Sequence, residues 1–310
     1  MGIAERITGG ETAANSKTIM GFRKETIEGA LWSLPYLAVF TVFLVWPAVR
    51  GLYMSLHTYP NKFDLTQTEW VGLQNYVELF QDPVFYNAME GTLLFVAVSV
   101  PALVLLGLVM ALGVNRDVAG KRTLRAIYFS PYVLTVAVVA LVWGQVYSQS
   151  YGLINYYLGF VMENPPGWLT SSDLVMASLA FMTVWWLVGF NFVIFLAARQ
   201  SIPERLYEAA RLDGATGWRA FKDITLPQMR NSVVFVVMVQ FILQFQVFAQ
   251  PYIMTQGGPS DSSDTLVYYL YRSAFSQQQF GYGAAMGYVL VAILILIAIV
   301  NFKVIGDSND

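Results

Sequence analysis

Long stretches without charge alternate along this chain with shorter stretches that carry most of its lysines and arginines. A helix needs about 20 apolar residues to cross the hydrocarbon core of a bilayer. Six stretches are long enough, so the pattern predicts an all-α membrane protein with six transmembrane helices. The predicted spans cover 29–49, 91–115, 126–148, 174–198, 231–254 and 282–302. Pro101 and Pro131 lie inside two of them, where membrane helices tolerate proline better than soluble helices do.

The composition supports a membrane protein. Hydrophobic residues make up 56% of the chain and charged residues 12%, whereas soluble domains average about 45–50% and about 25%. The net charge of −2 gives no strong attraction to nucleic acid. The chain has no cysteine and one histidine, His57. Disulfides, thiolate metal sites and clusters that need two histidines are therefore excluded, and we predict no catalytic residue and no metal site.

The distribution of lysine and arginine predicts the orientation in the membrane. Fifteen of the 18 basic residues fall in the N-terminal tail, the loops after the second and fourth spans, and the C-terminus. Basic residues favour the cytoplasmic side, so both termini are expected in the cytoplasm. The expected organisation is a tail over 1–28, a transmembrane permease domain over 29–304 and a tail over 305–310. The first span would serve as an uncleaved anchor of a multi-pass cell-membrane protein.

The segments on the other side of the membrane are too apolar to be disordered linkers. We expect short helices within 56–90 and an interfacial helix within 149–172. The segment that begins TQGGPSDSSDT is rich in turn residues, and another short helix is expected at 266–275.

The longest inner loop, 199–230, is richly charged and predicts a helix, a bend and a second helix. Ser201 and Glu204 have the spacing of a capping box, Gly214 is placed to end the first helix, and the second helix is expected at 216–223. Two interpretations stay open from these residues alone. The loop either contacts a partner or only anchors the chain at the surface, with Glu208 paired to a neighbouring arginine.

This loop resembles the EAA loop of permease subunits in binding-protein-dependent ABC importers. The resemblance lies in residues spread over both halves of the loop, and they are Glu208, Ala209, Ala210, Asp213, Gly214, Ile224, Leu226 and Pro227. It implies a type I ABC importer permease fold in which these residues form a coupling helix docked on a separate ATPase subunit. ATP and magnesium would then bind that partner, since this chain has no GxxxxGK[ST] phosphate loop.

Three further stretches, 71–88, 128–155 and 255–287, resemble the carbohydrate-uptake branch of these permeases, the maltose and glycerol-phosphate type. The implied function is translocation of a sugar or polyol derivative by alternating access. The implied partners are a second homologous permease subunit, two ATPase subunits and an extracytoplasmic solute-binding protein. Two alternatives remain: an importer of the same superfamily for a non-sugar solute such as an amino acid, or a stand-alone channel or carrier. A proton-driven carrier usually needs an ionisable residue within the membrane, and the six predicted spans contain none.

Glutamines on the fifth span form the candidate substrate wall. Gln240, Gln244, Gln246 and Gln250 fall within one arc of a helix of about 160°. An amide in hydrocarbon needs a hydrogen-bond partner, which is either a neighbouring helix or a solute hydroxyl. Counted without gaps from Glu208, the resemblance implies a pocket in this subunit. Its predicted substrate-binding residues are Trp185, Phe190, Gln240 and Gln244.

Overall fold

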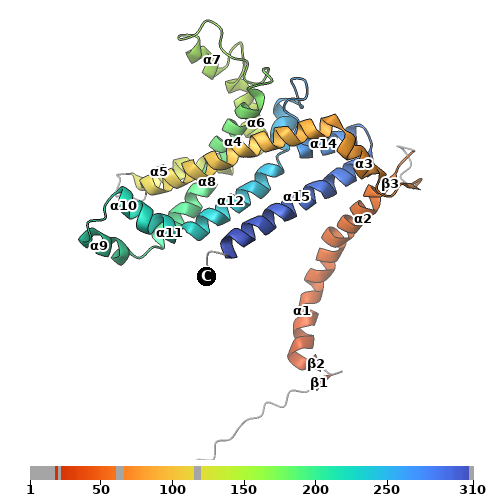
Figure 1. The fold of residues 1–310 in the computed structure, drawn as a ribbon, viewed down its shortest axis with the longest axis horizontal. Coiled ribbons are helices and arrows are strands. Elements are labelled where there is room, and N and C mark those ends of the chain that lie inside the picture. The colour runs from red at the N-terminus through yellow and green to blue at the C-terminus, as the bar shows by residue number, and fades with distance from the viewer. Residues whose placement is uncertain (1–17, 20–21, 61–65, 115–119, 307–310) are drawn as a thin grey trace, which may run out of the picture. The chain divides into compact units, whose positions relative to one another are not determined.

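The computed structural model describes residues 18–19, 22–60, 66–114 and 120–306, and it is mostly helical (Figure 1). The chain divides into two units, Met1–Tyr53 and Met54–Asp310. Most of the predicted N-terminal tail, and 307–310 of the C-terminal tail, lie outside the described residues.

The first unit is a small hairpin followed by one long helical rod. β1 (Thr18–Ile19) pairs antiparallel with β2 (Phe22–Arg23), and α1 (Lys24–Phe40), a π-helical turn η1 (Thr41–Val45) and α2 (Trp46–Ser55) follow. Every side chain over 31–50 is exposed. The stretch Leu31–Ser55 is long and apolar enough to cross a membrane, which matches the first predicted span.

The core of the second unit lies between α4 (Pro83–Val114), α8 (Val175–Gln200), α12 (Arg230–Phe245) and α15 (Phe280–Gly306). Buried α4 residues recur every three or four positions, as a helix packed along its whole length requires. A side chain at Gly107 would overlap Asn191 of α8, so this glycine allows α4 and α8 to approach closely. All four helices match predicted spans, although α4 begins at Pro83, eight residues before the predicted boundary.

The third predicted span is not one continuous helix. α5 (Lys121–Phe129) and the 3₁₀ turn η2 (Ser130–Val133) are bent by 99° from α6 (Val136–Val146). Pro131 supplies no backbone N–H, and Leu134 and Thr135 are extended. The carbonyl of Leu134 accepts a hydrogen bond from Trp186 Nε1 at 3.0 Å. The described residues thus contain five candidate spans, or six if this bent pair counts as one.

Several short elements lie near the end of α4 that carries Pro83 (Figure 1). β3 (His57–Thr58) pairs antiparallel with β4 (Glu69–Trp70), a hairpin that the sequence pattern did not predict. The expected short helices are present. They are α3 (Gln74–Gln81), α7 (Leu153–Leu158), which lies beyond α6 (Figure 1), and α14 (Leu266–Tyr271), with a π-helical turn η4 (Arg272–Ser276) after the last. A further short helix, α13 (Ala249–Met254), forms the end of the fifth predicted span.

The 199–230 loop lies at the opposite end of α4 (Figure 1). It consists of α9 (Glu204–Leu212), α10 (Trp218–Ala220), a π-helical turn η3 (Phe221–Thr225) and α11 (Leu226–Gln228). The second helix predicted at 216–223 therefore starts at Trp218, and helical turns continue from it almost into α12.

Candidate coupling and translocation sites

A Schellman motif ends α9 where the bend was predicted. Gly214 has φ +75°, its N–H donates to the carbonyl of Arg211 at 3.1 Å, and the N–H of Ala215 donates to the carbonyl of Ala210 at 2.8 Å. This is the pairing that satisfies the last carbonyls of a helix. Glycine suits the position because of its conformation, since a Cβ there would meet nothing within 4 Å.

The predicted capping box at the start of α9 is wrong. Pro203 occupies the N-cap position without a side-chain bond. The Ser201 hydroxyl instead donates to the carbonyl of Ala198 at 2.8 Å, which closes the last turn of α8. Local spacing was misleading because Ser201 lies next to two helix ends and bonds to the earlier one.

The two halves of the EAA-like motif meet in space. Tyr207 and Thr225 share a hydrogen bond of 2.9 Å between their hydroxyls, which ties α9 to η3. Beside it lies a hollow of about 380 Å³ that is lined from both halves of the motif. Its lining residues are Leu206, Ala209, Ala210, Asp213, Ala215, Arg219, Asp223 and Ile224. Glu208, Leu226 and Pro227 are exposed outside it.

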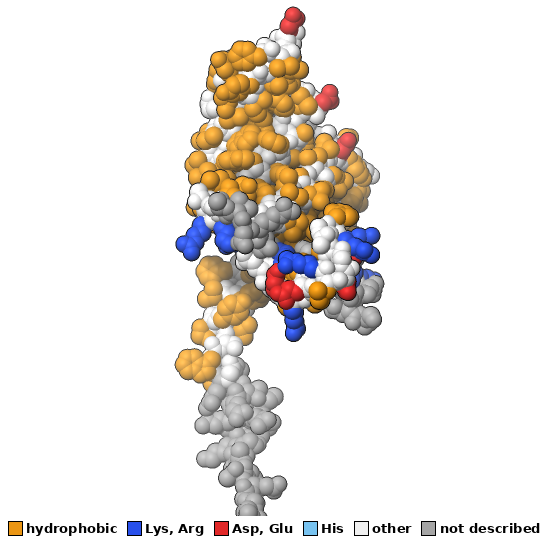
Figure 2. All heavy atoms as spheres, turned by 90° about the vertical axis from the view of Figure 1, so that its left-hand side faces the viewer, with side chains coloured by type: hydrophobic (Ala, Val, Ile, Leu, Met, Phe, Trp, Pro, Cys, Tyr) orange, Lys and Arg blue, Asp and Glu red, His pale blue; other side chains and the backbone are white. Residues whose placement is uncertain are grey.

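Charged side chains cover this end of the unit. Figure 2 faces it and shows lysines, arginines and carboxylates together, with hydrophobic side chains over most of the remaining face. Arg211 pairs with Glu204 at 3.8 Å and Arg219 with Asp223 at 3.9 Å, and all four side chains are more than half exposed. Glu208 pairs with no described residue, so the ion pairs considered for it in the surface-anchor interpretation are not formed.

A second cavity lies where two apolar helices are interrupted. The chain is extended between η2 and α6, and α12 stops at Phe245 before α13 begins at Ala249. Non-helical backbone at membrane depth occurs where it is buried in protein or lines a wet cavity. A cavity of about 540 Å³ lies between these breaks. Its lining residues are Tyr132, Val136, Trp186, Leu187, Leu243, Gln244, Gln246, Val247, Phe248, Ala249 and Gln250.

The glutamines form a buried chain that ends at this cavity. Gln240 Nε2 donates to Asn191 Oδ1 at 2.7 Å, and Gln244 Nε2 donates to Gln240 Oε1 at 2.9 Å. Gln240 is 1% exposed and does not line the cavity, whereas Gln244 does. Gln246 is exposed, and its amide donates to the carbonyl of Ile242. Gln240 therefore links two helices, and Gln244 carries the chain of amides to the cavity wall.

Neither of the aromatic candidates, Trp185 and Phe190, lines this cavity. Trp185 packs edge-on against Trp143, with ring centroids 5.5 Å apart. Phe190 stacks on Tyr132 at 5.4 Å, so it supports a ring that does line the cavity. Tyr132 and Val247 were not predicted from the sequence. Pro131 could have indicated Tyr132, because a proline at that position marks the break in the helix.

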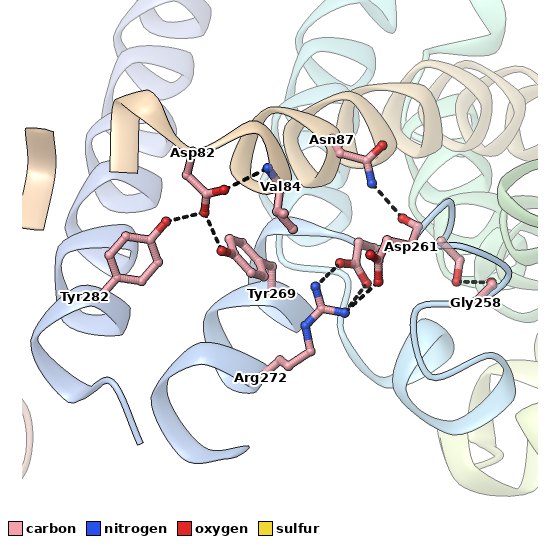
Figure 3. Close-up of polar contacts among 10 residues, drawn as sticks. Asp82, Val84, Asn87, Gly258, Asp261, Tyr269, Arg272 and Tyr282 are labelled. Carbon is pink, nitrogen blue, oxygen red and sulfur yellow. Dashed lines mark hydrogen bonds and ion pairs between the residues drawn. The ribbon is translucent and has the colours of Figure 1, made fainter. Parts of the chain in front are cut away.

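A polar network at the other end of the unit was also missed (Figure 3). Arg272 pairs with Asp264 at 2.6 Å and with Asp261 at 2.9 Å, and Asn87 of α4 donates to the carbonyl of Asp261. Asp82 accepts hydrogen bonds from the hydroxyls of Tyr269 and Tyr282 and from the N–H of Val84.

Burial shifts the acidity of this network. Burial raises the pKa of Asp264 to about 6, although the neighbouring Arg272 opposes the shift. Burial also acts to raise the pKa of Asp82, but the hydrogen bonds from the two tyrosines and from the backbone outweigh it and hold that pKa below its usual value.

The ion pairs of Arg272 and the hydrogen bond from Asn87 hold the 255–265 loop in place. Thr265 Oγ1 connects this loop to the cavity wall by donating to the carbonyl of Val247 at 2.9 Å.

Comparison with known proteins decides the family. Residues 92–304 match the family described as binding-protein-dependent transport system inner membrane component. The chain belongs to this family. It is therefore a multi-pass membrane component of a binding-protein-dependent transport system. The alternative interpretation, a stand-alone channel or carrier, is excluded.

Curated relatives match along most of their length. The diacetylchitobiose uptake permease of Streptomyces coelicolor is 33% identical over 91% of this chain and 84% of its own length. The trehalose/maltose permease of Thermococcus litoralis is 31% identical over 91% and 94%. The sn-glycerol-3-phosphate permease of Yersinia pestis is 32% identical over 87% and 91%.

A solved bacterial alginate ABC transporter, in complex with an alginate pentasaccharide-bound periplasmic protein, shares the fold. Its chain superimposes with a TM-score of 0.77 at 23% identity, over 90% of this chain and 93% of that one. The importer permease fold expected from the sequence is thereby confirmed at the level of architecture.

Proposed function

We propose that this chain is the membrane-spanning subunit of an ATP-driven importer that translocates a sugar or polyol derivative by alternating access. The observation that carries the proposal is the set of relatives. They match 87–91% of this chain and are named for diacetylchitobiose, trehalose/maltose and sn-glycerol 3-phosphate. No observation favours an amino acid or another non-sugar solute.

The proposed assembly contains this chain, a second homologous permease subunit, two ATPase subunits and an extracytoplasmic solute-binding protein. ATP and magnesium belong on the ATPase subunits. The 199–230 loop faces the cytoplasm together with both termini, and α9 docks on an ATPase subunit through Glu208. The exposed carboxylate of Glu208 and the hollow between the two halves of the motif support this role.

The proposed solute site is the cavity between the two helix breaks. Gln244 offers an amide that both donates and accepts hydrogen bonds, and the cavity is also lined by Trp186 and Tyr132, whose rings are apolar surfaces for the solute. Phe190 supports this wall through Tyr132, and Gln240 supports it through Gln244. Trp185 packs on Trp143, outside the lining. Closure of the ATPase dimer would move the α9 loop and open the cavity to the extracytoplasmic side.

Reconstituted transport tests the solute class. The complete transporter in proteoliposomes, with its binding protein and ATP, is given maltose, trehalose and glycerol 3-phosphate in one series and amino acids in another. ATP-dependent uptake of a member of the first series is expected. Uptake confined to the amino-acid series would overturn the sugar proposal and leave the family intact.

Cysteine labelling tests the orientation, because the chain has no native cysteine. An impermeant reagent added outside should label Ser260→Cys in the 255–265 loop and should spare Ala220→Cys in α10. The opposite labelling pattern would reverse the topology.

The role of Glu208 is tested by Glu208→Lys, which places a cation where the proposal needs a carboxylate. Solute-stimulated ATP hydrolysis should fall at least about tenfold while the chain still inserts, because replacing a charge-assisted attraction by repulsion costs more than about 1.4 kcal/mol. Glu204→Lys on the same helix is the matched control and should have a smaller effect. Unchanged stimulation in Glu208→Lys would return the loop to the surface-anchor interpretation.

Gln244→Leu tests the cavity wall. Removing one hydrogen bond costs about 0.5–1.5 kcal/mol, and an unpaired buried partner costs about 1–3 kcal/mol, so uptake per assembled complex should fall about tenfold. Gln246→Leu serves as a same-cavity comparison with a smaller expected effect, because that amide is already bonded to its own backbone. If uptake per complex is normal in Gln244→Leu, the amide chain serves packing alone.

A further inference from the structure

A third cavity, of about 650 Å³, lies between the end of α4 and the 199–230 loop. It belongs to neither of the two sites above. α4 supplies an apolar wall, and the loop supplies aromatic rings. The lining residues are Leu105, Leu108, Val109, Leu112, Arg199, Tyr207, Gly217, Trp218, Ala220, Phe221 and Thr225.

Among the described residues of this lining, Arg199 is the one with a charged side chain. It lies in the last turn of α8 and is half-buried. Its guanidinium lies over the ring of Tyr207, 4.1 Å from the ring centroid. The side chain of Arg199 has no hydrogen bond or ion pair to any residue in the described part of the chain. The planar guanidinium carries five N–H donors and can bind a phosphate through two parallel hydrogen bonds. The cavity therefore contains a cation whose N–H donors are available to an anionic ligand.

The apolar wall faces the surroundings of the helix bundle. Leu105 and Val109 are 61% and 63% exposed, and they lie in the last turns of a helix long enough to span the membrane. Trp218, also exposed, stands at the rim, and tryptophan is common at the level of lipid headgroups. A ligand that fills this cavity therefore has an anionic head and an apolar chain.

We propose that the cavity binds one anionic phospholipid, with its phosphate on Arg199 and an acyl chain along Leu105, Val109 and Leu112. A zwitterionic lipid fits less well, because none of the described lining residues is a carboxylate that would receive its ammonium group. A soluble phosphate ester would leave the apolar wall uncovered. Basic pockets beside transmembrane helices are suited to such headgroups.

The bound lipid would join α4 to the loop that carries the EAA-like motif, through Tyr207, Trp218 and Phe221. This assignment rests on the proposed membrane setting of the 199–230 loop and is independent of the solute. A lipid of this kind would add to the contacts that Tyr207 and Phe221 already make with the core residues of α4.

Native mass spectrometry of the purified full chain in a neutral detergent tests the proposal. Dioleoylphosphatidylglycerol, dioleoylphosphatidylcholine and glycerol 3-phosphate are titrated separately. We expect one phosphatidylglycerol per chain, bound at least about tenfold more tightly than phosphatidylcholine, because the headgroup pairs with a guanidinium. Glycerol 3-phosphate should bind far more weakly than the lipid, and any binding of it should be unchanged in Arg199→Gln, since it is also a candidate solute of the other cavity. Equal affinity for the two lipids, or glycerol 3-phosphate binding as tight as that of phosphatidylglycerol and lost in Arg199→Gln, would overturn the proposal.

Two variants locate the site. Arg199→Gln should weaken phosphatidylglycerol binding about tenfold and abolish the preference over phosphatidylcholine, whereas Arg205→Gln, an exposed arginine of the same loop, should leave both unchanged. Val109→Trp fills the apolar wall from an exposed position and should reduce the binding of both lipids, which keeps the test valid if Arg199→Gln does not fold. Unchanged binding in Val109→Trp would place the lipid elsewhere. The measurement needs no transport, so a failure to import sugar would count against the proposed function alone.

Discussion

The two ends of the second unit differ in how far their charged side chains are buried and paired. At the end that carries α14, Asp264 is buried and pairs with the half-buried Arg272, and Asp82 accepts hydrogen bonds from two tyrosine hydroxyls (Figure 3). At the end that carries α9, the pairs Arg211–Glu204 and Arg219–Asp223 are long and exposed, and Glu208 and Arg199 have no ionic partner among the described residues.

At the α14 end the charged groups stabilise the chain itself. At the α9 end they are available to bind other molecules. Exposed ion pairs contribute about 0–1 kcal/mol, so the α9 end gains little from its charges and can exchange them for contacts with other molecules. A buried pair is costly to break, because the remaining charge has no water. The α14 end is therefore a fixed platform, and through Thr265 and Val247 it also fixes one wall of the cavity.

The largest effect is expected at Arg272. Arg272→Met leaves Asp264 as a buried carboxylate without its cation and should lower the free energy of unfolding by about 3–5 kcal/mol. Arg219→Met removes an arginine from an exposed pair at the α9 end and should cost less than about 1 kcal/mol. Unfolding by SDS titration, followed by circular dichroism in mixed micelles, measures both.

The double variant Asp264→Asn/Arg272→Met separates charge burial from packing. It should recover most of the stability that Arg272→Met removes, since the buried charge is gone. If the two single arginine variants cost the same, the contrast between the two ends would not hold.

The next effect is the pH dependence that Asp264 confers. Its pKa in the folded chain, about 6, lies above the usual 3.8, so the folded state holds a proton that the unfolded state has already released between about pH 4 and 6. This contribution to stability is full below about pH 4 and is lost as the pH rises through about 6. It amounts to at most about 3 kcal/mol.

The contribution is measured as a difference between two proteins. From pH 4 to 7, the wild-type chain should lose more stability than Asp264→Asn, which carries no proton to release. Parallel pH profiles for the two would show that Asp264 titrates at its ordinary value.

Gln240→Leu should have a smaller effect than Arg272→Met, and we expect it mainly on the stability of the folded chain. It leaves Asn191 Oδ1 buried without its donor, at a cost of about 1–3 kcal/mol. Folded protein in the membrane should decrease while uptake per assembled complex falls less than in Gln244→Leu. An uptake defect larger than that of Gln244→Leu, at normal stability, would place Gln240 in contact with the solute.

The spans could be predicted from the sequence because length and apolarity are properties of each segment alone. The start of α4 was missed because polar residues at its beginning, such as Asn87, are satisfied by a distant loop. The bend after Pro131 was missed for a similar reason. Proline permits the break, but the side chain of Trp186 on another helix satisfies the freed carbonyl.

In the candidate sites, too, local features could be predicted from the sequence and long-range contacts could not. The EAA-like motif is local in sequence, so its residues and the bend at Gly214 could be named. Periodicity put Gln240 and Gln244 on one face but could not tell which of them reaches a cavity, nor choose Trp186 over Trp185. The Asp82 network joins residues 187 and 200 positions apart, and no local pattern indicates such a contact.

The smallest effect is expected at the bend of the α9 loop. Gly214 has a positive φ, where a Cβ strains the backbone but meets no neighbouring atom, so Gly214→Ala should cost about 1 kcal/mol. Gly144 of α6 has equal space around it and no positive φ. Gly144→Ala should therefore be neutral or stabilising by about 0.5–1 kcal/mol. Hydrogen exchange at the amide of Ala215, which donates to Ala210, should speed up in Gly214→Ala and stay unchanged in Gly144→Ala. Because the ion pairs at the α9 end are exposed and contribute little, this small destabilisation should loosen the EAA-like loop and leave the α14 end untouched. Equal loosening at both ends would show that the two regions are one cooperative unit.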